Sequence, residues 1–216
     1  MSRLLLVSAS PRGEASESRR LSAALLDGHA AAGGGPVDRL DLFADPLPPF
    51  AAREATAKMA VIGGSVPTGV DAAAWERVLA LGARVAAADA LVLAAPMWNS
   101  GIPWALKLFV DTVTQPGVAF RFDPERGYVG LLGGRRAAVL ATSHVYAPGV
   151  PAAFGVDHHV AYLEQWLTMC GFGPVDVVRL QPSRPGSPGL EQRRERALAE
   201  ARAVGRALAA VPAVAR

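Results

Sequence analysis

Residues 90–95 constrain the fold most strongly, because all six are apolar (Ala-Leu-Val-Leu-Ala-Ala). A short, unbroken apolar run of this kind is typical of a strand that is buried on both faces of a parallel sheet. A loop, Pro96 to Ser100, and a helical pattern from about Gly101 to Thr114 follow this run. Strand, loop and helix in this order predict one unit of an α/β fold with a parallel sheet.

The same alternation of apolar runs and helical patterns continues along the chain. Further strands are predicted over residues 3–8, 37–42, 137–142 and 175–180, and helices from about 16 to 33, from 71 onward, over 158–170 and over 190–210. A short strand is predicted over 117–122. The pattern predicts one doubly wound domain over residues 1–216, with five main strands and helices on both faces of the sheet. Residues 43–70 show no sustained period, which predicts a lid or a surface that a partner covers.

The composition limits the class of protein. Of the 216 residues, 51% are hydrophobic and 19% are charged, which argues against a disordered chain. No apolar stretch approaches the roughly 20 residues of a membrane-spanning helix. The N-terminus runs directly into a strand pattern, without room for a signal peptide. The single cysteine, Cys170, excludes a disulfide framework and is predicted to lie in the core, so we expect a cytoplasmic protein.

The charged residues do not indicate a nucleic-acid or metal site. The net charge is +3, and the densest basic cluster, residues 193–196, is interleaved with glutamate at the start of a predicted helix. This arrangement favours a solvated helix face over a nucleic-acid patch. His158 and His159 lack carboxylate or cysteine partners at metal-ligand spacing, so we expect them on the surface at a helix N-terminus.

Four serines, at positions 8, 10, 16 and 18, surround the predicted start of the first helix. The first N–H groups of a helix lack intrahelical partners and its dipole is positive there, so this end favours an anion. A helix cap alone requires one hydroxyl, from Ser16 or Ser18, with Glu14 or Glu17 helping. Because the loop supplies four hydroxyls, the pattern favours a phosphate site over a simple cap.

The loop from Pro96 to Ser100 follows the third predicted strand. In open α/β sheets, ligands bind beyond the carboxyl ends of the strands. The thioether of Met97, the indole of Trp98 and the amide of Asn99 together suit a flat heteroaromatic ring. The alternative interpretation places Met97 and Trp98 in the core, where Trp104 and Leu108 are also predicted to lie.

A third loop, Ser143 to Gly149, follows the fourth predicted strand and therefore lies beside the same cleft. Its histidine and tyrosine, His144 and Tyr146, suggest a proton donor and a stacking group. The alternative is a mobile lid with ordinary surface residues.

The usual dinucleotide and nucleoside triphosphate motifs are absent from the sequence. It contains no G-x-x-x-x-G-K-[ST] motif and no G-x-G-x-x-G after the first strand, which argues against a permanently bound dinucleotide. A hydroxyl-rich phosphate loop and a ring-binding loop at one sheet edge instead fit a mononucleotide. Flavin mononucleotide (FMN) is the natural candidate.

Several motifs resemble the family of FMN-dependent NADH azoreductases, which are flavodoxin-like quinone and azo-dye reductases. The family's first-loop serine and S-x-S are found here as Ser10 and Ser16-Glu17-Ser18, and its A-P-M-Y-N-F loop as Ala95-Pro96-Met97-Trp98-Asn99-Ser100. Its L-K-x-x-x-D and A-G-V-T-F-x-Y segments match residues 106–111 and 116–122, and its Y-L-x-x-x-L-x-x-x-G segment begins at Tyr162. The resemblance implies a flavodoxin-like sheet with strand order 2-1-3-4-5 and a homodimer with the active site near the subunit boundary.

The resemblance also implies which residues bind FMN. Ser10, Ser16, Glu17 and Ser18 would bind its phosphate end, and Pro96, Met97, Trp98, Asn99 and Ser100 its isoalloxazine ring. The family's S-R-G-G loop is Ser143-His144-Val145-Tyr146 here, so only the serine is retained and two glycines are replaced.

We therefore predict an FMN-dependent oxidoreductase that takes hydride from transiently bound NADH or NADPH and passes two electrons to a quinone or azo compound by a ping-pong mechanism. No catalytic side chain is required, although His144 or Tyr146 is positioned to contact the acceptor. One alternative is a non-enzymatic electron carrier of the flavodoxin type. A hydrolase with Ser10 or Ser143 as nucleophile is disfavoured, because neither lies in a G-x-S-x-G motif.

Overall fold

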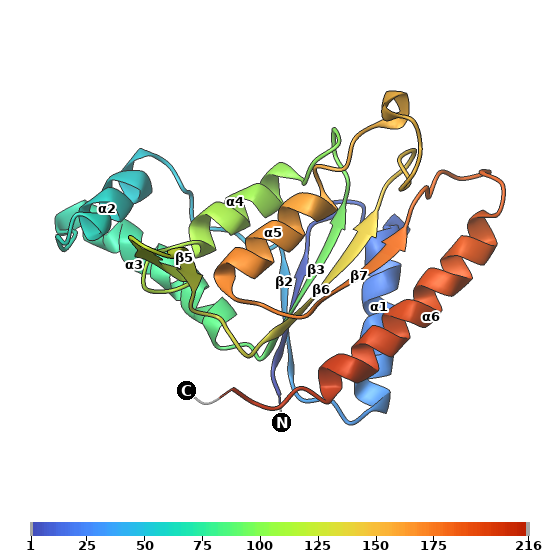
Figure 1. Ribbon diagram of the computed structural model, residues 1–216, viewed down its shortest axis with the longest axis horizontal. Helices are drawn as coiled ribbons and strands as arrows, with labels where there is room; N and C mark the ends of the chain where they lie inside the picture. Colours follow the sequence, from blue (N-terminus) through green and yellow to red (C-terminus); the bar gives the residue numbers. More distant parts are fainter. Residues whose placement is uncertain (1, 215–216) are drawn as a thin grey trace.

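A computed structural model describes residues 2–214 of the chain. Its central sheet has five parallel strands in the order β2-β1-β3-β6-β7, and a separate antiparallel hairpin joins β4 to β5 (Figure 1). The strands are β1 (Leu4–Ser8), β2 (Val37–Asp41), β3 (Ala90–Pro96), β4 (Phe120–Asp123), β5 (Gly127–Gly130), β6 (Arg136–Thr142) and β7 (Val175–Leu180). Because β6 and β7 are the fourth and fifth strands of the main sheet, this arrangement confirms the predicted order 2-1-3-4-5.

Helices cover both faces of the sheet, as expected for a doubly wound fold (Figure 1). On one face lie α1 (Glu17–Ala31) and α6 (Leu190–Ala209). On the other lie α3 (Gly69–Ala86), α4 (Trp104–Val113) and α5 (Val160–Cys170), and α2 (Ala52–Ile62) packs against α3 at the end of the molecule. Two short 3-10 turns, at Gly13–Ala15 and Ala152–Phe154, lie in the loops above the sheet.

The unbroken apolar run of β3 supplies both cores. Leu91 and Leu93 pack with α3, α4 and α5, whereas Val92 and Ala94 pack with α1 and α6. Alternate residues of a strand point to opposite faces, so a strand between two helical layers must be apolar at every position. The central position of β3, between β1 and β6, follows from this composition.

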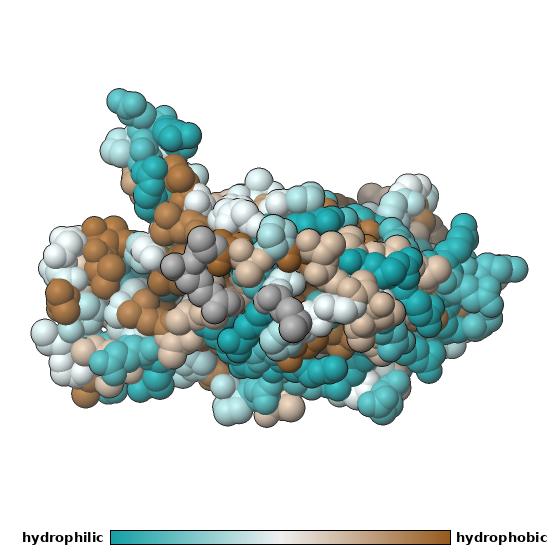
Figure 2. All heavy atoms as spheres, turned by 90° about the horizontal axis from the view of Figure 1, so that it is seen from below, coloured by the Kyte–Doolittle hydropathy of each residue, from teal (hydrophilic) through white to brown (hydrophobic). Residues whose placement is uncertain are grey.

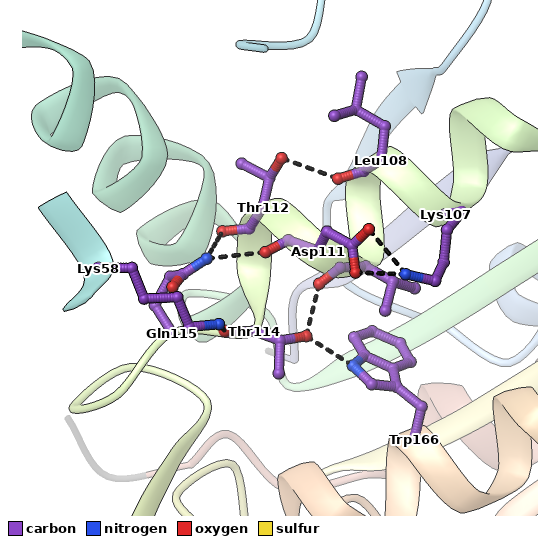
Figure 3. Close-up of polar contacts among 9 residues, drawn as sticks. Lys58, Lys107, Leu108, Asp111, Thr112, Thr114, Gln115 and Trp166 are labelled. Atoms are coloured by element: carbon purple, nitrogen blue, oxygen red, sulfur yellow. Dashed lines mark hydrogen bonds and ion pairs between the residues drawn. The ribbon is translucent and has the colours of Figure 1, made fainter. Parts of the chain in front are cut away.

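A polar cluster holds the C-terminal end of α4 against α2 and α5 (Figure 3). The ammonium of Lys58 in α2 donates to the carbonyl of Thr114 at 3.0 Å, and the indole N–H of Trp166 in α5 donates to the Thr114 hydroxyl at 2.8 Å. The side-chain amide of Gln115 donates to the carbonyls of Asp111 and Thr112, at 2.7 and 2.9 Å. These contacts satisfy carbonyls that the end of a helix leaves without partners, and they fix the helix that follows the loop after β3.

Two sequence predictions about helices are wrong. Residues 43–70 were expected to be irregular, but they contain α2 and the start of α3, which begins at Gly69 and not at Asp71. Only Glu54 and Ala57 of α2 are buried, so its apolar period is too weak to detect. The helix expected from Gly101 begins at Trp104, after Pro103.

The predicted positions of three single residues are also wrong. Trp104 was expected in the core but is 63% exposed, and Leu108 is only half-buried. His159 was expected on the surface but is fully buried, whereas its neighbour His158 is exposed. Cys170 lies in the core as predicted, and burial raises the pKa of its thiol to about 12.

Helices α1 and α6 approach each other so closely that only glycine fits at the crossing. A Cβ atom at Gly205 would lie 1.9 Å from the carbonyl oxygen of Leu25, and one at Gly28 would lie 2.1 Å from that of Arg202. We expect Gly205→Ala to lower the free energy of unfolding by about 2 kcal/mol, because the helices must separate. Urea unfolding measures this change.

Helix propensity alone gives the opposite sign for this substitution, since alanine is favoured over glycine by about 1 kcal/mol in a helix. The exposed position 203 in the same helix is the matched control: Ala203→Gly should cost only the propensity difference. A Gly205→Ala protein as stable as the wild type, or more stable, would contradict close packing at this crossing.

Within residues 2–214, none of the helices is both long enough and apolar enough to cross a membrane.

Candidate functional site

The loop after β1 gathers three buried serines around the N-terminus of α1. Ser10, Ser16 and Ser18 are each no more than 3% exposed. The hydroxyl oxygen of Ser16 accepts the backbone N–H of Arg19 at 3.3 Å, and the hydroxyls of Ser16 and Ser18 lie 3.0 Å apart. Ser16 is therefore the helix cap, one of the two residues considered for that role. Ser10 and Ser18 are hydroxyls beyond what the cap requires.

The loop after β3 is a tight turn that fixes the position of Trp98. Trp98 and Gly101 exchange two backbone hydrogen bonds, each 2.9 Å long. Asn99 and Ser100 between them have φ angles of 48° and 66°, the left-handed conformation required at both central positions of a type I′ turn. Trp98 is half-buried with its ring centroid 5.9 Å from that of Phe43, and Asn99 projects into solvent.

The loop after β6 is held by hydrogen bonds to Ser143. Its hydroxyl donates to the carbonyl of Tyr146, and its carbonyl accepts both the backbone N–H and the hydroxyl of Ser183, at 2.7 and 2.8 Å. His144 and Val145 are exposed, whereas Tyr146 is half-buried beside Gly155. The left-handed φ of Gly155, 117°, allows the chain to pass close to both Tyr146 and Ser100.

These three loops line one pocket with a cavity volume of about 160 Å³. Its lining residues are Ser10, Pro11, Arg12, Ser16, Glu17, Pro96, Met97, Trp98, Thr142, Ser143, His144 and Ser183. Eight of the thirteen predicted site residues are in this lining. Ser18 is not among the lining residues, although its hydroxyl lies 3.0 Å from that of Ser16. Asn99, Ser100, Val145 and Tyr146 lie outside the enclosed cavity.

Sequence reasoning missed four lining residues, which are Pro11, Arg12, Thr142 and Ser183. Ser183 follows β7, so the rule that ligands bind beyond the carboxyl ends of parallel strands applies to it as well. Arg12 lies in the serine-rich loop and its side chain is exposed at the pocket. It adds a cation to a site whose other side chains are mostly neutral.

His159 is the buried titratable group nearest in sequence to the third loop. It is 0% exposed, and neither ring nitrogen has a hydrogen-bond partner among residues 2–214. Burial lowers the pKa of His159 to about 4; the negative charge of Asp157 opposes this shift, and the positive charge of Arg179 adds to it. The carboxylate of Asp157 accepts the backbone N–H groups of His159 and Val160, at 3.0 and 2.7 Å, and so caps α5. The imidazole is therefore neutral at pH 7.

The described residues bring together no group of three or more His, Cys, Asp or Glu side chains suited to hold a metal ion. The lining residues include the carboxylate of Glu17 and the imidazole of His144, and the other polar side chains are hydroxyl donors and the guanidinium of Arg12. Such donors suit an oxyanion at the start of α1.

Residues 2–204 match the family model for the flavodoxin-like fold. An FMN-dependent NADH:quinone oxidoreductase of Ruegeria pomeroyi is 43% identical over 184 residues, which cover 85% of this chain and 90% of the relative. One of Nitratidesulfovibrio vulgaris is 38% identical over 205 residues, covering 94% and 97%. Among solved structures, an azoreductase from Bacillus anthracis superposes with a TM-score of 0.87 at 26% identity, over 96% of this chain and all of that one.

Proposed function

Because this chain belongs to the flavodoxin-like family of FMN-dependent NADH:quinone oxidoreductases, we propose that it binds FMN and uses NADH or NADPH to reduce quinones and aromatic azo compounds. The observation that carries the proposal is the pocket itself. It joins buried serines at a helix N-terminus to a tryptophan held on a rigid turn. The serines suit the phosphate of FMN, and the tryptophan suits its flat ring.

The serine-rich end of the pocket fits the phosphate. Ser10, Ser16 and Ser18 offer hydroxyl donors, and the backbone N–H groups of Glu17 and Ser18 lie in the first turn of α1, where the helix dipole favours an anion. Pockets for drug-sized ligands have volumes of roughly 300–1,000 Å³. A cavity of about 160 Å³ therefore encloses only part of the cofactor.

The other two loops supply surfaces for the ring. The loop after β3 forms an apolar wall of the pocket with Pro96, Met97 and Trp98. The next two residues, Asn99 and Ser100, lie outside the cavity. His144 lines this pocket, and together with Val145 and Phe154 it also lines a neighbouring apolar cavity. Tyr146 follows in the same loop and is half-buried. Because the Ser143 hydroxyl is bound to the Tyr146 carbonyl, we expect Ser143 to shape its loop and not to donate to a ligand.

When bound, FMN would supply the redox chemistry that links oxidation of NADH or NADPH to reduction of the quinone or azo compound. The residues of this chain bind and orient it, and no side chain of the pocket is required as an acid or base. His144 is exposed at the rim and is the side chain best placed to contact an acceptor. Since both substrates would use the same exposed site in turn, we expect ping-pong kinetics.

Purified protein tests the proposal through its absorption spectrum and its activity. We expect flavin bands, or their appearance after FMN is added, and NADH-dependent reduction of a soluble quinone with parallel double-reciprocal plots. A protein that binds no flavin and reduces no quinone would contradict the proposal. Flavin that is bound but not reduced by NADH or NADPH in stopped-flow experiments would instead indicate an electron carrier.

We further propose that the protein forms a homodimer. We also propose that it is cytoplasmic, because a free thiol such as the buried Cys170 is typical of proteins in a reducing compartment. Large apolar side chains are exposed on α2, on the loop after it, on the β4–β5 hairpin and at the start of α4. They include Trp104, Phe122, Tyr128, Met59, Ile62 and Val66, each at least 54% exposed. Seen from below, apolar residues gather at the end of the molecule where α2 and α3 lie (Figure 2). Exposed apolar clusters of this kind mark protein interfaces.

The position of Trp104 ties this interface to the site. The rings of Trp104 and Phe43 are in edge-to-face contact, with their centroids 5.8 Å apart. Phe43 in turn contacts the ring of Trp98. Sedimentation equilibrium tests the proposal: twice the chain mass of 22.5 kDa is expected, and a monomer at micromolar concentration would contradict it.

A further inference from the structure

An acidic side chain lines the pocket that would receive the phosphate. Glu17 is the first residue of α1, next to the capping Ser16, and it is among the residues that line the cavity. A free carboxylate beside a phosphate would repel it, because like charges in a partly desolvated site interact strongly. A phosphate can therefore bind here only if a positive charge compensates the Glu17 carboxylate.

Arg194 of α6 supplies that charge. Its Nη2 lies 2.7 Å from Oε1 of Glu17 and its Nε lies 3.2 Å from Oε2, so the guanidinium binds both carboxylate oxygens. The two side chains are only 18% and 16% exposed. Such two-point contacts between arginine and a carboxylate are the strongest kind of ion pair in proteins. Glu191 in turn binds the remaining nitrogen of Arg194.

Among residues 2–214, no other basic side chain binds both carboxylate oxygens of Glu17. Arg20 lies 3.6 Å from Glu17 through one nitrogen, and its side chain is 51% exposed, so solvent weakens this contact. The ion pair with Arg194 depends on the close crossing of α1 and α6, which the two glycines at that crossing permit.

We propose that Arg194 is a positioning residue of the cofactor site. It holds the Glu17 carboxylate toward α6 and neutralises it, which leaves the N-terminus of α1 able to accept a phosphate dianion. This inference rests on the proposed function, since it concerns the affinity of the same site for FMN.

A double-mutant cycle tests it, with the dissociation constants of FMN and of riboflavin measured by flavin fluorescence on the apoproteins. We expect Arg194→Gln to weaken FMN binding at least 10-fold, because the carboxylate is left unpaired beside the phosphate. Glu17→Gln should change FMN binding by less than 3-fold. The double variant should bind FMN within 3-fold of Glu17→Gln, since without the carboxylate the arginine is not needed.

Riboflavin, which lacks the phosphate, separates this charge effect from general damage to the pocket. Its affinity should change by less than 3-fold in every variant, including Arg194→Gln. Circular dichroism of each apoprotein confirms that it is folded.

Arg196 on the same helix is the matched control, because it is exposed and, within the described part of the chain, its side chain donates to the carbonyl of Gln192 and pairs with no carboxylate. Arg196→Gln removes the same unit of charge and should leave FMN binding within 2-fold of the wild type. The inference is overturned if Arg194→Gln has no larger effect than Arg196→Gln, if it weakens riboflavin equally, or if Glu17→Gln does not restore binding. Failure of the wild-type protein to bind FMN would overturn the proposed function instead.

Discussion

Apoprotein with both Ser16 and Ser18 replaced by alanine should bind FMN about 100-fold more weakly than the wild type. A hydrogen bond to a charged group is worth about 1.5–3 kcal/mol. Loss of two such bonds at the low end of this range amounts to about 3 kcal/mol, which corresponds to roughly two factors of ten in affinity. Both hydroxyls are buried at the helix end that would hold the phosphate. Fluorescence titration with FMN measures the change.

The effect on binding must be separated from the effect on folding, because Ser16 also caps α1. Loss of the cap should lower the free energy of unfolding by about 1 kcal/mol. Ser22 is the matched control: it is a buried serine of α1 whose hydroxyl donates to the Ser18 carbonyl at 2.9 Å, and it lies outside the pocket. Ser22→Ala should leave FMN affinity unchanged. A loss below 3-fold in the double alanine variant would contradict phosphate binding at these serines.

Acidification from pH 7 to pH 4 should destabilise the protein by about 3 kcal/mol through His159 alone. Burial lowers the pKa of this side chain to about 4 in the folded protein, against 6.5 in the unfolded chain. The unfolded state therefore binds more protons between these values, so the free energy of unfolding falls as pH falls through this window. Each pKa unit corresponds to 1.36 kcal/mol. Urea unfolding at several pH values measures the slope.

His159→Gln isolates this contribution, because glutamine does not titrate. The variant should have a flatter dependence of unfolding free energy on pH between 6.5 and 4 than the wild type. His29 is also buried and burial lowers its pKa, so the difference between the two proteins is the quantity to compare. The exposed His158 is the matched control, and His158→Gln should keep the wild-type slope. Equal slopes for His159→Gln and the wild type would contradict a neutral buried imidazole.

The sheet could be predicted from sequence because its central strands are buried on both sides. Residues 90–95 and 137–142 are almost wholly apolar, and each is followed by a loop and then, after a variable connection, by a helix. Such strands leave few alternatives to a parallel sheet between helical layers. The loops that line the pocket follow directly from this order.

The orientation of α4 could not be predicted, because most of its residues are apolar. The face toward the sheet is formed by Ala105, Leu106, Phe109, Val110 and Val113. Trp104 and Leu108 have the same i, i+4 spacing as the true core residues, so periodicity alone does not distinguish the two faces. Contacts made in the folded protein distinguish the two faces: the turn before Pro103 at one end of the helix, and the bonds of Lys58 and Trp166 to Thr114 at the other.

His159 and Arg194 show the limit of local patterns in a different way. His158 and His159 are adjacent at the start of α5, and the sequence does not distinguish them. In the structure His159, the residue before the helix, is buried, whereas His158 is exposed. Arg194 lies 177 residues from Glu17, and their contact exists only because α1 and α6 cross. Contacts of this kind depend on tertiary packing and leave no signal in spacing.

The proposed function depends on binding of FMN at the pocket formed by the loops after β1, β3 and β6. Isothermal titration of the apoprotein, first with FMN and then in a separate experiment with riboflavin, tests it most directly. We expect saturation at one FMN per chain and markedly weaker binding of riboflavin, because the serines at the start of α1 would have no phosphate to bind. Absence of saturable FMN binding, or equal affinity for the two flavins, would contradict it.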